Sequence, residues 1–71
     1  MIDPVRQEIL QVLGELGEVV PEVRLGQLLA NLSYLAGGLS SEAIWNMEDD
    51  ELLAVARDHL EEWRSRRGVP V

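Results

Sequence analysis

The stretch EDDELLAVARDHLEEWRSR, residues 48–66, carries the strongest structural signal in this sequence. Its apolar and aromatic side chains recur every three or four residues, the spacing that places them on one face of an α-helix. The face that we predict to be buried comprises Leu52, Val55, Ala56, His59, Leu60 and Trp63. Glu62 and Arg66 have the favoured acid-before-base order at a spacing of four. Gly68 and Pro70 are typical of a helix end, so a helix is predicted over about 48–66.

A second helix is predicted over about 21–36, PEVRLGQLLANLSYLA. It should begin near Pro21 or Glu22, because proline is well tolerated in a first helical turn. The two glycines at 37 and 38 are expected to end it. Its predicted apolar stripe consists of Leu25, Leu28, Leu29, Leu32 and Leu35.

A first helix is predicted over about 3–17. Asp3 is a good N-cap, and Pro4 stands at the first helical position, where its missing N–H costs nothing. Gly17 is expected to terminate this helix in the left-handed conformation. The predicted apolar stripe comprises Val5, Ile9, Val12, Leu13 and Leu16.

The link between the second and last helices contains more apolar residues than a solvated loop needs: Leu39, Ile44, Trp45 and Met47. We expect it to form a short helical or extended element near 40–46 that lies against the core. The complete prediction is one all-α domain, residues 1–71, a small bundle of three main helices with this fourth element. Residues 67–71 are expected to form a loose C-terminal tail.

A chain of 71 residues buries only about 60% of the surface that it exposes when unfolded, so its stability margin is thin. Small domains usually add a disulfide, a metal or a second copy of themselves. The chain has no cysteine, and His59 is its single histidine, which disfavours a zinc site. We therefore expect that self-association into a homodimer stabilises this domain.

Thirteen acidic residues oppose six arginines, and the net charge is −7. This balance argues against nucleic acid as a direct partner and favours a basic protein. Three of the arginines, Arg64, Arg66 and Arg67, complement the negative end of the last helix. The sequence shows neither a secretory signal nor the run of about 20 apolar residues that a membrane span needs, so a cytoplasmic location is the default expectation.

The acidic run Glu48, Asp49, Asp50 and Glu51 has three interpretations. Acids stabilise the positive N-terminal end of a helix, so helix initiation is the first. Contact with a basic partner or with Arg24 is the second, since four acids exceed what the helix dipole requires. A metal site is disfavoured, because successive helical side chains point in different directions and the pattern of a calcium-binding loop is missing.

Arg24, Gln27 and Asn31 form a polar line on the face adjacent to the leucines of the second helix. This line is either a solvated face or an interface, within the chain or between copies, bonded to carbonyls or to the acids at 48–51. Gly26 favours an interface, because glycine inside a helix is costly unless a second backbone comes close.

The remaining chemistry-bearing residues indicate no enzyme. His59 is the only base available to the serines, and no nucleophile motif surrounds them. We therefore interpret His59 as a hydrogen-bonded core or boundary residue, and Trp45 and Trp63 as core or interface anchors. No catalytic residue, cofactor or metal ligand is predicted.

The order RLGQLLANL, an apolar-aromatic link, then EDDELL resembles a family of short uncharacterised bacterial proteins. Their pattern is an Arg-x-Gly-Gln-Leu-x-x-Asn helix followed by an acidic helix start. The matching residues are Arg24, Gly26, Gln27, Leu28, Asn31, Trp45, Glu48, Asp49, Asp50, Glu51 and Leu52. The resemblance implies that the polar line and the acidic run belong to one design and contact each other.

A second stretch, AGGLSSEAI, is similar to the Gly-Gly-x-Ser motif of peptidyl carrier domains. That resemblance implies a phosphopantetheine arm on Ser40. Against it, residues 22–36 read as a helix, where carriers have a long loop, and the chain after Ser40 is short. The function we predict is a small acidic, non-enzymatic interaction or accessory module that self-associates. A carrier modified at Ser40, or an acidic DNA mimic that inhibits a basic protein, are the alternatives.

Overall fold

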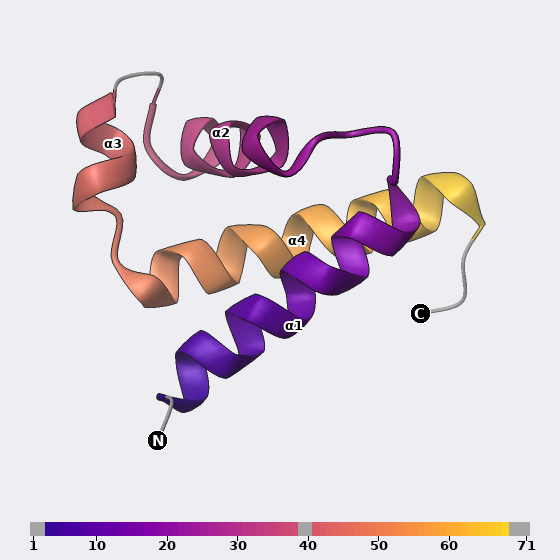
Figure 1. The fold of residues 1–71 in the computed structure, drawn as a ribbon, viewed down its shortest axis with the longest axis horizontal. Helices are drawn as coiled ribbons and strands as arrows, with labels where there is room; N and C mark the ends of the chain where they lie inside the picture. Colours follow the sequence, from indigo (N-terminus) through magenta and orange to yellow (C-terminus); the bar gives the residue numbers. More distant parts are fainter. Residues whose placement is uncertain (1–2, 39–40, 69–71) are drawn as a thin grey trace.

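The computed structural model describes residues 3–38 and 41–68, and all the regular structure within them is helical (Figure 1). The helices are α1 (Pro4–Val19), α2 (Leu25–Ala36), α3 (Ser41–Asn46) and α4 (Asp49–Arg67). The all-α prediction is confirmed, and the short fourth element is a helix. None of the described helices has both the length and the apolar character needed to cross a membrane.

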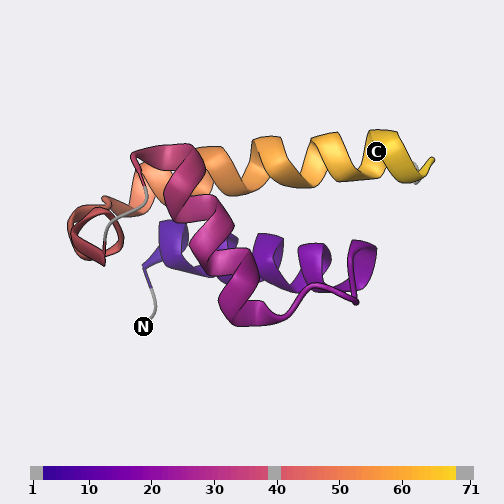
Figure 2. The same cartoon turned by 90° about the horizontal axis from the view of Figure 1, so that it is seen from above.

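Helices α1 and α4 lie side by side and run in the same direction (Figures 1 and 2). Three ion pairs join them in parallel order: Arg6 with Asp49, Glu8 with Arg57, and Glu15 with Arg64. Two parallel neighbours need a connection that returns along their length. Helix α2 provides it, crossing obliquely over the pair in the opposite direction, and α3 turns the chain back into α4.

The core forms where α2 crosses the α1–α4 pair. Its buried side chains are Ile9, Val12, Leu16, Leu28, Leu32, Leu53, Ala56 and Leu60. The predicted faces of α1 and α4 are largely confirmed, since the other predicted residues of both helices are half-buried at the edge of this core. Leu53, which the prediction left out, is buried. The molecule measures 34 × 31 × 17 Å, so it is about two helices thick.

The ends of α1 and α2 differ from the prediction. Gly17 does not terminate α1, because the N–H of buried Val20 donates to the Leu16 carbonyl at 2.9 Å and continues the helical turn. Helix α2 begins at Leu25 rather than near Pro21, because Val23 N–H donates to the Val20 carbonyl at 3.0 Å and holds the connection in a turn. Both hydrogen bonds involve the backbone of Val20, whose side chain is buried.

The end of α4 is close to the prediction. Gly68 follows the helix in the left-handed conformation, with φ of 69°, and its N–H donates to carbonyls of the last turn. Arg67 belongs to the helix, so it is not part of a loose tail, and residues 69–71 lie outside the described residues. Arg67 also pairs with Glu22, which ties the α1–α2 connection to the end of α4.

The Glu22–Arg67 pair makes a testable contribution to acid sensitivity. A backbone hydrogen bond to Glu22, and then Arg67, hold the Glu22 pKa below its ordinary value of 4.5. A carboxyl whose folded pKa is depressed stabilises the fold above that value, and this stabilisation is lost as the pH falls through the folded pKa. We expect Glu22→Gln to melt below wild type at neutral pH and to match it at acidic pH. Thermal melts over a pH series would measure this.

Glu18→Gln is the control, because Glu18 is an exposed carboxylate of α1 without an ion pair among the described residues. Its melting temperature should follow that of wild type at every pH. A Glu22→Gln deficit that stayed constant down to strongly acid pH would contradict the assignment.

Candidate interaction surface

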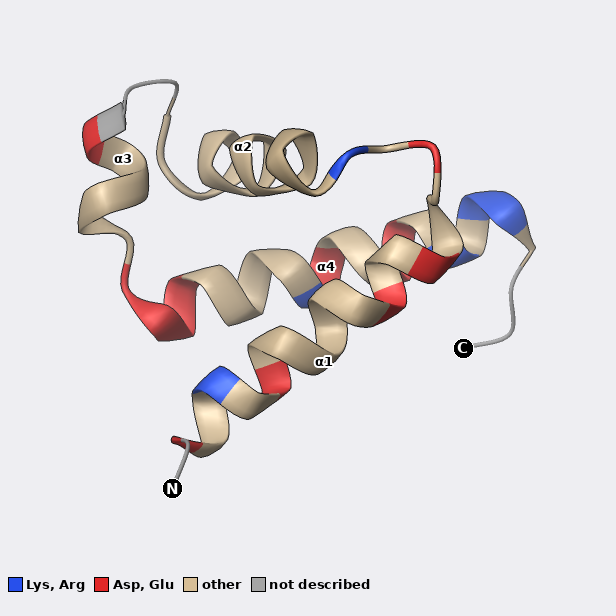
Figure 3. Cartoon of the chain, in the orientation of Figure 1, with Lys and Arg blue, Asp and Glu red and all other residues tan. Residues whose placement is uncertain are grey.

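Helix α2 is exposed along most of its length yet carries no charged residue (Figure 3). Eight of its twelve residues are exposed to solvent. A helix facing water normally has charged side chains on its outer face, and the other two long helices of this chain do. The sequence already shows that residues 25–36 contain no charged side chain, and the prediction did not take this into account.

The predicted leucine stripe of α2 is only partly buried. Leu28 and Leu32 reach the core, whereas Leu25, Leu29 and Leu35 are exposed, so the core of this chain covers only part of the predicted stripe. The cause is the oblique crossing, in which one stretch of α2 rests on the α1–α4 pair (Figure 2). Tyr34, which was not singled out in the sequence, is also exposed.

Helix α3 extends this exposed area. Trp45 is 88% exposed and Ile44 is 53% exposed, so these two side chains do not lie against the core as predicted. A six-residue helix has room for one inward side. Ala43 of α3 is half-buried, and so is Met47, which follows the helix. Helices α2 and α3 pack against each other. We define the α2–α3 surface as the exposed side chains of Leu25, Leu29, Tyr34, Leu35, Ile44 and Trp45.

The polar line lies on the outside of α2. Arg24, Gln27 and Asn31 are all exposed. Gln27 has a local role, because its Oε1 accepts a hydrogen bond from the Arg24 N–H at 3.1 Å and so caps the start of the helix. A Cβ added at Gly26 would meet nothing within 4 Å. The close backbone approach expected at Gly26 is therefore not made by any residue that the structure describes.

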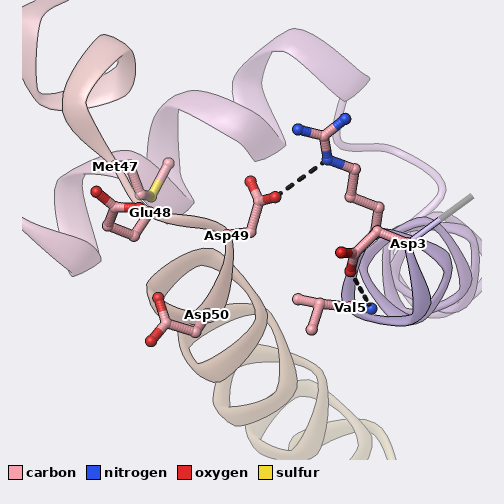
Figure 4. A pocket seen from close by; sticks show the side chains of 7 residues that line it. Asp3, Val5, Met47, Glu48, Asp49 and Asp50 are labelled. Carbon is pink, nitrogen blue, oxygen red and sulfur yellow. Dashed lines mark hydrogen bonds and ion pairs between the residues drawn. The ribbon is translucent and has the colours of Figure 1, made fainter.

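The acidic run starts α4, and the side chains of Glu48, Asp49 and Asp50 point in different directions (Figure 4). Glu48 is the N-cap residue, and Asp49, Asp50 and Glu51 occupy the first turn, as helix initiation requires. Asp49 pairs with Arg6 of α1 at 3.1 Å, and Asp50 Oδ1 accepts from the Glu51 N–H at 3.0 Å. Within residues 3–38 and 41–68, no group of three or more histidines and acids is placed to hold a metal ion.

Arg24 and the acidic run are not brought together within the chain. Arg24 lies two residues from Glu22, whose partner Arg67 ends α4, whereas the acids begin α4. The intramolecular contact between Arg24 and these acids was therefore a wrong expectation, and Arg6 takes its place. Every other arginine has an acidic partner, and Arg24 alone has none in the part of the chain that the structure describes.

His59 and Trp63 have a structural role. The Trp63 indole N–H donates to His59 Nε2 at 3.1 Å, and the two rings meet edge to face at 6.2 Å between centroids. Arg66 and Arg67 each place a guanidinium over the Trp63 ring, at 5.5 and 5.2 Å from its centre. The prediction of a hydrogen-bonded boundary histidine is confirmed. Trp63 is half-buried against the core, as an anchor should be.

Comparison of the chain with protein-family models, with curated proteins and with solved structures gave no match. The resemblance to a family of short bacterial proteins therefore stays a prediction. Ser40 lies outside the described residues, so the carrier alternative stays a prediction as well.

Proposed function

We propose that this chain is a small, non-enzymatic interaction module that associates with itself through the α2–α3 surface. The observation that carries the proposal is an exposed helix without charge. The cores of protein interfaces are depleted in charged residues and enriched in aromatic ones. Helix α2 has no charge and exposes Tyr34, and Trp45 extends from the neighbouring helix.

A basic protein is the second class of partner that the charges favour. The net charge is −7, and Glu48, Asp50 and Glu51 have no ion-pair partner among residues 3–38 and 41–68. Such a field accelerates association with a cationic protein and disfavours nucleic acid. Self-association is the first proposal because the α2–α3 surface is apolar rather than acidic.

The molecular mass in solution tests the proposal. We expect light scattering or sedimentation to give twice 8.0 kDa at high concentration and a monomer on dilution. Trp45→Ser and Leu35→Ser each remove an exposed apolar anchor, so both should shift the equilibrium to monomer. Their helical circular dichroism should be unchanged, because neither side chain belongs to the core. A wild-type chain that stays monomeric at every concentration would overturn self-association.

A further inference from the structure

Charged residues lie at or beside both ends of α2, and the dipole of this helix favours neither of them. An α-helix has partial positive charge at its N-terminus and partial negative charge at its C-terminus. Arg24, a cation, is the N-cap residue of α2 and is without an acidic partner in the described part of the chain. Neither the dipole of α2 nor an ion pair with a described residue stabilises the charge of Arg24.

A hollow lies at the C-terminal end of α2, and an acidic residue, Glu51, lines it. Its lining residues are Ala36, Gly37, Ala43, Asn46, Met47 and Glu51. The Glu51 carboxylate makes no hydrogen bond or ion pair with any described residue, and it lies beside the negative end of α2. The hollow therefore places a free carboxylate beside the negative end of α2, and both attract a guanidinium.

We infer that two copies pack their α2 helices antiparallel about a two-fold axis, with Arg24 of each copy in the hollow beside Glu51 of the other. This arrangement rests on the proposed self-association and specifies its geometry. A helix of twelve residues is about 18 Å long, so both of its ends fit within one standard interface. The two-fold axis then forms the same Arg24–Glu51 contact twice.

A parallel arrangement is disfavoured by the same charges. It would place Arg24 beside Arg24 and Glu51 beside Glu51, and like charges across an interface are repulsive. Antiparallel packing brings opposite charges together and also opposes the two helix dipoles. Between the two ends, the exposed, uncharged side chains of α2 meet those of its own copy. The link between Arg24 and the acidic run is thereby made between copies.

A charge-swap experiment tests this geometry. Arg24→Glu and Glu51→Arg each place two like-charged contacts in a homodimer, so the dimer dissociation constant of each variant should rise about tenfold or more. When the two variants are mixed, every contact in the heterodimer joins opposite charges. We expect the mixture to recover dimerisation to near the wild-type level, measured by sedimentation with one variant labelled.

Glu61→Arg is the matched control, because it makes the same charge change on an exposed residue of α4 ten residues away, about 15 Å along the helix. Its dissociation constant should stay near that of wild type. Both test residues are exposed, and an acid at position 24 suits the start of α2, so Arg24→Glu should fold as wild type does. Glu51→Arg removes an acid from the first turn of α4, so its helical circular dichroism is compared with that of wild type.

The outcomes separate the two proposals. A wild-type chain that never dimerises overturns self-association itself. A wild-type dimer whose stability is indifferent to both charge changes, or whose variants fail to rescue each other, overturns the antiparallel geometry and leaves self-association in place. Weakened single variants together with a restored mixture support the geometry.

Discussion

Leu32→Ala is expected to lower the free energy of unfolding by about 2–5 kcal/mol, the range for a leucine removed from a sealed core. Leu32 is 0% exposed and holds α2 onto the α1–α4 pair. A chain of 71 residues has a total stability of roughly 4–11 kcal/mol, so this single change removes a large part of it. Urea denaturation followed by circular dichroism measures the difference.

Leu29→Ala is the matched control, because it is the same substitution three residues earlier on the same helix. Leu29 is 38% exposed, so its truncation should cost less than about 1 kcal/mol in the monomer. The measurement is made at a concentration where the chain is monomeric, which keeps any interface out of the comparison. Equal losses for the two variants would show that α2 does not rest on the pair as described.

Ala56→Leu is expected to destabilise the chain by about 1–3 kcal/mol, because extra carbon atoms must enter a packed site. Ala56 is 0% exposed on the side of α4 that faces the core. Its small side chain permits the close approach of neighbouring helices, and a leucine would force them apart or into strained rotamers. The shift in the urea midpoint at constant slope measures this effect.

Ala54→Leu supplies the comparison two residues away. Ala54 is exposed on the same helix, and leucine and alanine are both good helix formers, so stability should change by no more than about 0.5 kcal/mol. If Ala56→Leu were tolerated as well as Ala54→Leu, the tight packing of α4 would be refuted.

These core substitutions and the interface substitutions act on different parts of the molecule. The core residues are buried, whereas the residues of the α2–α3 surface are exposed. Leu32→Ala should therefore lower stability at every protein concentration, whereas Trp45→Ser should matter only where copies associate. This contrast separates a folding defect from a binding defect in any functional assay of the chain.

The existence of the helices and the inward faces of α1 and α4 were determined by the sequence alone. The reason is that periodicity and capping are local. Asp3 accepts from the Val5 N–H at 2.8 Å, and the acids at 49–51 form the first turn of α4, as their spacing predicts. The left-handed Gly68 belongs to the same class of local signal. Such interactions span no more than a few residues, so they can be predicted from the sequence without knowledge of the tertiary structure.

The tertiary structure alone decided which parts of these helices face solvent. The leucines of α2 share one stripe, and an oblique crossing buries only Leu28 and Leu32. The parallel course of α1 and α4 brings Arg6 rather than Arg24 to Asp49, and the brevity of α3 leaves Trp45 outside the core. Crossing angles and pairings arise from contacts between residues distant in the chain, and no local pattern encodes them. The way the helices cross therefore decides which residues form the candidate surface. The lack of charge in α2 could already be read from the sequence.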